Sequence, residues 1–391
     1  MIKKIVKLGD VCERVSVGHV GQTTDFYTDS SGVPFLRTQN VNESGLIVDD
    51  LKFITQDFHN TLKKSTLKAG DVVLSRVVSS RVNSAIIPLG LDGANCANII
   101  LARPIPDLLC SSYLNHLLQS KSMQSLLMSR QVGSAQSVVN TTVLKNLELY
   151  LPSLNEQKRI AAILDKADSL RRKRAQAIAL ADDFLRATFL EMFGDPVTNP
   201  KGWPIETLKN LTNKLTDGTH KSPPNISGGV PYVTAKHIKE TGVDFNKNPT
   251  YISQQDHVDI YSRCNPEVGD VLYIKDGATT GVACVNNLQG EFSLLSSVAL
   301  IKVGAKLSSS YLVFLLNNNN FKEVLLSEMS GAAIRRFTLA KIGNFRIPVP
   351  PVELQKSFDG IRNKVVRGVL SMDEARGWSD ALCRSVLNSY L

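Results

Sequence analysis

Polar and basic residues gather in loops that follow apolar, strand-like segments. In the first half, the loop at 78–83 (Val-Ser-Ser-Arg-Val-Asn) follows the apolar segment VVLSRV; in the second half, the loop at 276–281 (Asp-Gly-Ala-Thr-Thr-Gly) follows Val271–Lys275. An arginine in such a loop can fork onto guanine, and lysine or serine can hold phosphate. Since recognition commonly resides in loops on a scaffold, this pattern favours nucleic-acid contact.

The candidate DNA contacts share a donor side chain and a place in or beside such a loop. They are Arg37, Thr38, Asn40, Arg76, Ser79, Ser80 and Arg81 in the first half, with His220, Lys221, Lys236, His237, Lys275, Thr279, Thr280, Arg335 and Arg336 in the second. A structural role is the alternative for both histidines. The basic cluster at 171–174 has two interpretations, contact with phosphate or a partner, and a solvated helix face.

Catalytic signatures are missing from the sequence. It contains no GxxxxGK[ST], GxSxG or HExxH motif. The segment at 222–225 (SPPN) lacks the closing aromatic residue of the amino-methyltransferase motif, so we interpret it as a proline-rich turn. Pro106-Asp107 with Glu156-Gln157-Lys158 fits a PD…ExK nuclease pattern poorly, because the gap is wide. The six histidines are scattered without ligand spacing. We therefore predict no catalytic residues, no metal ligands and a chain that is not an enzyme.

The composition indicates an anionic partner and a reducing compartment. The net charge is +9 and the isoelectric point about 9.2, which favours nucleic acid, although many soluble proteins are mildly basic. The six cysteines show no CxxC spacing, so we expect reduced core residues. The N-terminus lacks a signal-peptide core and no apolar run is long enough to span a membrane. These features predict a cytoplasmic protein with no membrane partner.

A long amphipathic helix is expected at 155–193, in the middle of the chain. Apolar residues recur there at three- and four-residue intervals, and neither glycine nor proline interrupts the segment before Gly194. At about 1.5 Å per residue this helix would be on the order of 55 Å long. Its apolar face is too long to lie in water, so it requires a partner helix.

Comparison of the sequence with itself supplies that partner. When the two halves are aligned, Gln157 matches Gln355, and the apolar positions that follow also match, up to the last residue, Leu391. The Gly70-Asp71 and Gly269-Asp270 segments also coincide. The predicted coiled-coil interface comprises Ile160, Ile163, Ala167, Leu170, Ile178, Phe184, Phe358, Ile361, Val365, Leu382 and Val386.

The chain is therefore expected to be two tandem copies of one unit, each a globular half followed by a long helix. We predict an α+β fold in which each half mixes helices with many short strands. The expected boundaries are 1–152 for the first globular domain, 153–195 for the central helix, 196–350 for the second domain and 351–391 for the C-terminal helix. Single helices are expected at 111–128 and 310–329.

Several segments at the half-chain repeat carry a family resemblance. They are LPSLNEQKRIAAILDKADSLRRK, FLRATFLEMFGDPVTNPKGW, GDVLYIKDGATTG and IPVPPVELQK. Together they resemble the specificity subunit of Type I restriction-modification enzymes over the whole chain. The resemblance implies two target-recognition domains, each reading one half of a bipartite DNA site. They would be separated by two antiparallel helices forming a coiled coil, with a pseudo-twofold internal repeat.

The resemblance also implies partners and cofactors. The chain would bind double-stranded DNA and recruit two modification (methyltransferase) subunits and further restriction (translocase/nuclease) subunits. No cofactor would be bound by the chain itself: S-adenosylmethionine, ATP and Mg²⁺ belong to the partner subunits. Three alternatives stay open at this point: the recognition subunit of a Type II-like enzyme, a stand-alone DNA-binding regulator, and a structural coiled-coil adaptor.

Overall fold

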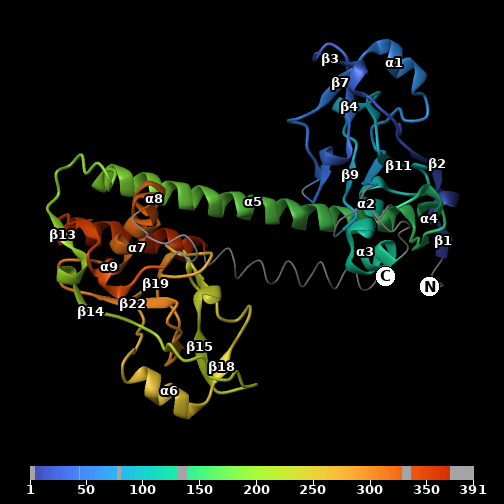
Figure 1. Cartoon of the computed structure of the whole chain (residues 1–391). Coiled ribbons are helices and arrows are strands. Elements are labelled where there is room, and N and C mark those ends of the chain that lie inside the picture. Colours follow the sequence, from blue (N-terminus) through green and yellow to red (C-terminus); the bar gives the residue numbers. More distant parts are fainter. Residues whose placement is uncertain (1–4, 44, 77–80, 130–138, 328–335, 370–391) are drawn as a thin grey trace. The chain divides into compact units, whose positions relative to one another are not determined.

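The computed structural model contains two similar α+β units (Figure 1). It describes residues 5–43, 45–76, 81–129, 139–327 and 336–369. By its internal contacts, the first unit extends to Ala175 and the second begins at Gln176. The division therefore lies inside the long helix α5 (Leu154–Phe193), between the predicted boundaries at 153 and 195.

The first unit is built on two small sheets. An antiparallel sheet has the order β2-β11-β8-β9, and a mixed one the order β10-β4-β7-β3. The strands are β1 (Ile5–Lys7), β2 (Cys12–Val17), β3 (Tyr27–Thr28), β4 (Val33–Leu36), β5 (Val41–Asn42), β6 (Gly45–Leu46), β7 (Lys52–Ile54), β8 (Val72–Ser75), β9 (Ser84–Ile86), β10 (Asn95–Cys96), β11 (Ile99–Pro104) and β12 (Glu148–Tyr150). The helices are α1 (Gln56–Thr61), α2 (Ser111–Gln119), α3 (Lys121–Ser129) and α4 (Thr141–Lys145).

The second unit repeats this plan. Its larger sheet has the order β14-β22-β19-β20 and its smaller one the order β18-β15-β21. The strands are β13 (Ile205–Thr207), β14 (Thr212–Asp217), β15 (Val230–Val233), β16 (Ile238–Lys239), β17 (Gly242–Val243), β18 (Tyr251–Ile252), β19 (Val271–Ile274), β20 (Ala283–Val285), β21 (Ser293–Leu294), β22 (Val298–Val303) and β23 (Arg346–Pro348). The helices are α6 (Gln254–Tyr261), α7 (Ser309–Asn317), α8 (Asn319–Ser327) and α9 (Leu339–Gly343).

The two copies agree in strand register and local geometry, which confirms the internal repeat. Gly70 and Gly269 adopt φ values of 88° and 95°, a conformation that favours glycine. The aspartate that follows each glycine accepts a hydrogen bond from a backbone N–H three residues earlier and pairs with a cation on an inner strand of a four-stranded sheet, β11 or β22. These pairs are Asp71 with Arg103 at 2.7 Å and Asp270 with Lys302 at 2.8 Å.

Each unit has its own core, and α5 contributes to both. In the first unit, Ile160, Ala161 and Leu164 of α5 join the core beneath β11 and α2. In the second unit, Phe189 and Phe193 of α5 pack with residues of α7 and of the C-terminal helix, whose described part covers 352–369. Aromatic packing of this kind anchors each helix on a domain by burying large apolar surfaces.

Two expected helices are each divided into two. The segment predicted as one helix at 111–128 is α2 and α3, and the segment predicted at 310–329 is α7 and α8. At the breaks, Ser120 (ψ 150°) and Asn318 (ψ 126°) adopt extended backbone. The Asn318 side chain accepts a hydrogen bond from Phe321 N at 3.1 Å and so starts the next helix. Short polar side chains compete with the helical hydrogen bonds, so apolar spacing alone missed both breaks.

Candidate nucleic-acid interface

In the first half, Arg37 is held at the surface by an exposed carboxylate. It lies after β4, at the N-terminal side of the short 3-10 helix η3 (Thr38–Asn40), and its Nη2 donates to Asp50 Oδ2 at 3.0 Å. Gln39 Nε2 donates to the same oxygen at 2.8 Å. The Thr38 hydroxyl donates to Asn98 O at 2.9 Å. The Arg37 guanidinium and the Gln39 side-chain amide therefore lie together around the Asp50 carboxylate.

A second basic group in this half lies at the end of β8. Arg76 is half-buried, and its carbonyl accepts a hydrogen bond from Val139 N at 3.2 Å. Arg81 Nη1 lies 3.5 Å from Glu43 Oε1, and the Arg81 side chain is 33% exposed. The predicted contacts Ser79 and Ser80 lie outside the described residues.

Two of the candidates are buried and hold loops together, so the prediction that they contact DNA is corrected. Asn40 and His237 are each 1% exposed and occupy the same place in the two halves. Asn40 Oδ1 accepts from Arg37 N at 2.8 Å, and His237 Nδ1 accepts from Thr234 N at 3.0 Å. The opposite end of each side chain donates to a carbonyl further along the loop, Ile47 O and Asn248 O.

In the second half, the structure brings His220 and Lys275 together around Asp217, the last residue of β14. Lys275 Nζ and His220 Nε2 each lie 3.3 Å from Asp217 Oδ2. Arg263, which the sequence analysis did not select, lies 3.3 Å from Asp217 Oδ1. No motif marks Arg263 in the sequence; proximity in the fold alone identifies it.

The prediction that Lys275 and Thr280 contact DNA directly is corrected, because both side chains are buried. The Lys275 side chain is 2% exposed and lies between Asp217 and Asp276. Thr280 is 8% exposed, and its hydroxyl donates to Gly277 O at 2.7 Å. The neighbouring Thr279 is exposed at the tip of the same loop, within reach of a ligand.

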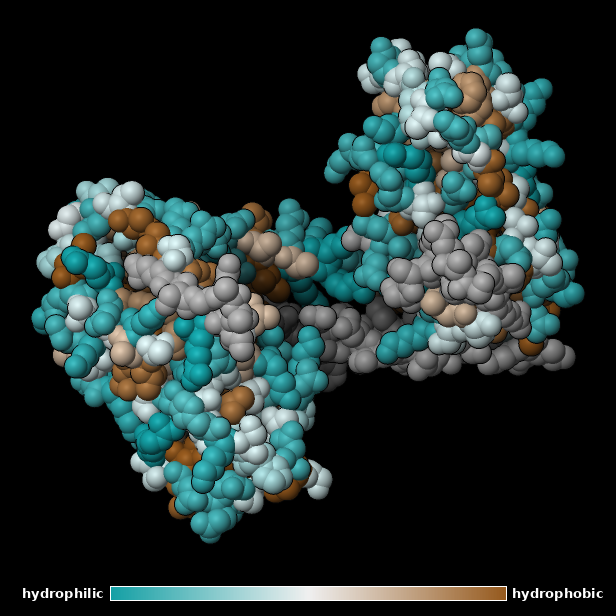
Figure 2. Space-filling model, viewed as in Figure 1, coloured by the Kyte–Doolittle hydropathy of each residue, from teal (hydrophilic) through white to brown (hydrophobic). Residues whose placement is uncertain are grey.

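The remaining candidates of the second half lie at the surface. Lys221 and Lys236 are exposed. Arg336, whose side chain is 52% exposed, lies 4.0 Å from Asp276 Oδ2. Arg335 lies outside the described residues. Hydrophilic residues cover most of the face drawn in Figure 2, with hydrophobic ones in small patches.

The predicted coiled-coil residues occupy several environments. Ile160 is buried in the core of the first unit. Phe358 is fully buried, with ring centroids 5.6 Å from both Phe189 and Phe193 of α5. Leu170 and Phe184 are exposed, the latter by 53%. The others that the structure describes are half-buried: Ile163, Ala167, Ile178, Ile361 and Val365. Leu382 and Val386 lie outside the described residues.

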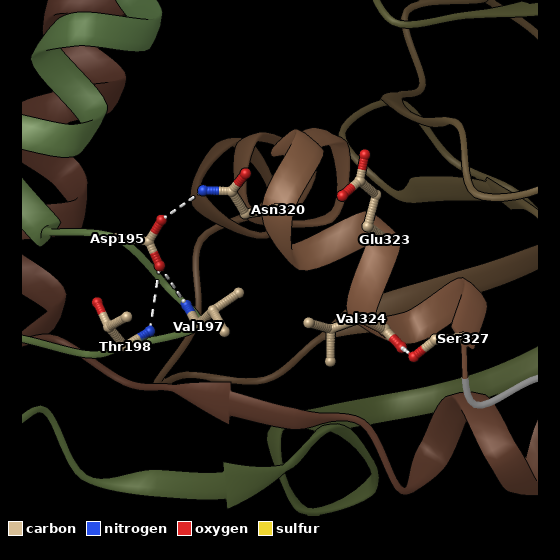
Figure 3. Close-up of a pocket in the computed structure, with 7 residues that line it drawn as sticks. All are labelled: Asp195, Val197, Thr198, Asn320, Glu323, Val324 and Ser327. Atoms are coloured by element: carbon tan, nitrogen blue, oxygen red, sulfur yellow. Dashed lines mark hydrogen bonds between the residues drawn. The ribbon is translucent and has the colours of Figure 1, made fainter.

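A pocket next to the end of α5 has acidic and apolar walls rather than basic ones (Figure 3). Asp195 accepts hydrogen bonds from Val197 N, Thr198 N and Asn320 Nδ2 at 2.8–3.1 Å. The hydrogen bond from Asn320 is the main reason that the pKa of Asp195 is lowered. The carboxylate therefore stays ionised and organises the turn after α5, which makes this pocket unsuitable for phosphate.

The buried cysteines that the structure describes are not activated as nucleophiles. Burial raises the pKa of Cys12, Cys96, Cys264 and Cys284 to about 12, so these thiols stay protonated at neutral pH. Within the described ranges, no three His, Cys, Asp or Glu side chains are grouped to hold a metal ion. Of the helices in those ranges, none has the length and apolar character of a membrane span.

Known proteins match this chain in both sequence and fold. A putative type I restriction enzyme MjaX specificity subunit of Methanocaldococcus jannaschii is 25% identical over 368 residues, 86% of this chain and 81% of the relative. The type I restriction enzyme MjaIX specificity subunit of that organism is 22% identical over 271 residues, 64% of this chain and 61% of the relative.

Two solved structures share the fold. A chain from a study of complex assembly and conformational transition of the type I R-M system aligns with a TM-score of 0.53 at 22% identity, over 99% of this chain and 97% of that one. The Type-I restriction-modification system S subunit from M. genitalium aligns with a TM-score of 0.62 at 15% identity, over 98% and 94%. The family model described as "Type I restriction modification DNA specificity domain" matches residues 3–180 and 200–358, one segment in each half. The chain thus belongs to the Type I restriction-modification DNA specificity family.

Proposed function

We propose that each half of the chain reads one half of a bipartite double-stranded DNA site, and that the long helices set the gap between the half-sites. The observation that carries this proposal is the duplicated frame with unlike side chains at equivalent positions. Asn40 and His237 hold equivalent loops by hydrogen bonds. At equivalent strand ends, however, the first half has the apolar Val17 and the second half the acidic Asp217. A shared frame with different side chains suits the recognition of two different half-sites.

The proposed DNA contacts are the candidates that face solvent wholly or in part. They are Arg37, Thr38, Arg76 and Arg81 in the first half and His220, Lys221, Lys236, Thr279 and Arg336 in the second. Ser79, Ser80 and Arg335 remain proposals from the sequence. Arginine and histidine are suited to base edges, and lysine to phosphate.

The long helices supply a rigid separation in this proposal. At about 1.5 Å per residue, α5 is on the order of 60 Å long, whereas DNA rises about 3.4 Å per base pair. A helix anchored at its two ends in separate cores fixes a distance better than a flexible linker does. The modification subunits would dock on the exposed faces of these helices, where Leu170 and Phe184 lie at the surface.

In this proposal the chain is not itself an enzyme. Two modification subunits would transfer methyl groups from S-adenosylmethionine, and restriction subunits would use ATP and Mg²⁺ to move and cut DNA. The free cysteines of the described residues suit a cytoplasmic setting, in which thiols stay reduced.

A methyl-transfer assay tests this division of labour. The full-length chain, its modification subunit, and both together are incubated with DNA and labelled S-adenosylmethionine. We expect label in DNA only when both proteins are present, and only in duplexes that contain the split site. Transfer by the chain alone, or equally selective transfer by the modification subunit alone, would contradict the proposal.

A further inference from the structure

One carboxylate in the second half is shared by three basic side chains. Asp217 contacts Lys275 and His220 through Oδ2 and Arg263 through Oδ1, each at 3.3 Å. Arg263 Nη2 also donates to Gly218 O. These side chains come from separate segments: the end of β14, the loop after it, the residues after α6 and the end of β19. The carboxylate therefore ties four parts of the domain together.

The sheet fixes the position of this carboxylate. Asp217 pairs with Ala299 of β22, and Ile274 pairs with Val298, so Asp217 and Lys275 lie at the same end of the strands that flank β22 in the sheet. The next residue, Gly218, lies so close to the backbone of Leu294 that a Cβ at this position would be 1.9 Å from Leu294 O. The backbone at Asp217 consequently has little freedom to shift, and its carboxylate is a rigid anchor.

The cluster has a buried centre and an exposed rim. The Asp217 and Lys275 side chains are 5% and 2% exposed, whereas those of Arg263 and His220 are 50% and 58% exposed. The inner pair is therefore unavailable to a ligand. The exposed part of the Arg263 guanidinium and the exposed His220 ring can contact a ligand, while the Asp217 carboxylate restricts the motion of both side chains.

Among the described residues of the first half, the equivalent strand end carries no acid. By strand register, Val17 opposite Ile100 takes the place that Asp217 takes opposite Ala299. An ordinary structural requirement of the shared frame would need the acid in both halves. Its presence in one half points instead to a property that differs between the halves.

We propose that Asp217 is a positioning residue for base recognition by the second half, holding Arg263 and His220 in fixed orientations toward the base edges of one half-site. This inference rests on the proposed function. A carboxylate near DNA repels phosphate, so Asp217 weakens sequence-independent attraction. Its benefit is order, because an arginine that is held in place forms base hydrogen bonds with less loss of side-chain freedom.

The proposal has a signature that simple unfolding lacks. Replacing Asp217 by asparagine removes a negative charge and loosens Arg263 and His220. We expect affinity for random-sequence duplex to stay the same or to rise, while discrimination at the second half-site falls about tenfold or more. Discrimination at the first half-site should not change.

The test measures competition binding by the full-length chain with its modification subunit, using the enriched duplex and duplexes altered in either half-site. The matched control is Asp270→Asn, which also removes a carboxylate paired with a lysine, Lys302, but at the opposite end of β19. If Asp270→Asn loses discrimination at the second half-site to the same extent, the effect comes from general destabilisation and the proposal is overturned.

Two further variants keep the proposal testable if Asp217→Asn folds poorly. In Asp217→Asn/Lys275→Met, no unpaired lysine remains buried beside the removed acid, and the loss of discrimination must persist. Arg263→Ala should reduce discrimination at the same base pairs, with little added effect in Asp217→Asn/Arg263→Ala. If the wild type enriches a split motif and Asp217→Asn still discriminates normally at the second half-site, the positioning role of Asp217 is refuted but the proposed function is not. Lack of any motif for the wild type refutes the proposed function.

Discussion

Gln157 and Gln355 make the same three hydrogen bonds at equivalent points of the two halves. The side-chain oxygen of each accepts from a backbone N–H, that of Cys110 or Ser308, at 2.9 and 2.8 Å. Each Nε2 donates to two carbonyls, one of them from the proline segment that precedes the helix. Both glutamines are 0% exposed. The repeated glutamine therefore fixes the start of each long helix to its own domain.

Replacing either glutamine by leucine should loosen only the domain that contains it. Gln157→Leu removes the side-chain partner of the Cys110 N–H and of the Leu108 and Pro152 carbonyls, which should cost about 1 kcal/mol or more. Hydrogen exchange of the Cys110 amide should accelerate while that of Ser308 does not, with the reverse in Gln355→Leu. Lys158→Ala, at an exposed neighbouring position, is the control. Unchanged exchange at Cys110 would show that Gln157 is dispensable.

The aromatic contacts of α5 predict unequal effects for two phenylalanines that sequence analysis placed in one interface. Phe358 is fully buried, so Phe358→Ala should lower the free energy of unfolding of the second domain by about 3–5 kcal/mol. Phe184 is 53% exposed, so Phe184→Ala should change it by no more than about 0.5 kcal/mol. Urea unfolding followed by far-UV circular dichroism measures both. Equal losses would contradict the packing described.

The sequence alone predicted the repeat, the long helix and the loops, because each depends on local spacing. It could not predict which loop donors face solvent. His237 has the chemistry of a base contact, yet it is buried, and only its equivalence with Asn40 indicates a structural role. Arg263 was missed for the opposite reason: its function depends on Asp217, which is distant in sequence and adjacent in space.

His237 should make the second domain sensitive to acid. Burial, opposed in part by the hydrogen bond to Asn248 O, lowers the pKa of His237 from its usual 6.5. The unfolded chain then binds a proton that the folded chain does not, so stability should fall as the pH drops below about 6.5. His237→Asn, which copies Asn40 of the first half, should reduce this loss. Urea unfolding of the wild type and the variant at about pH 7.5 and 5.5 measures this loss of stability. An equal loss in the two proteins would exclude His237 as its source.

The exposed neighbour of His237 should act on DNA rather than on stability. If Lys236 contacts phosphate, Lys236→Ala should weaken binding to all sequences alike. The slope of log K against log salt concentration should then decrease in magnitude by about 0.9. Binding titrations at several salt concentrations provide the slope, and thermal unfolding of the variant should match that of the wild type. An unchanged slope would remove Lys236 from the interface.

The most direct test of the account is selection from a randomised duplex pool by the full-length chain together with its modification subunit, at two salt concentrations. We expect enrichment of one split motif with unlike halves and a constant gap, and weaker overall binding at the higher salt concentration. A continuous motif, or salt-sensitive binding without any enriched motif, would contradict the reading of two half-sites by two domains.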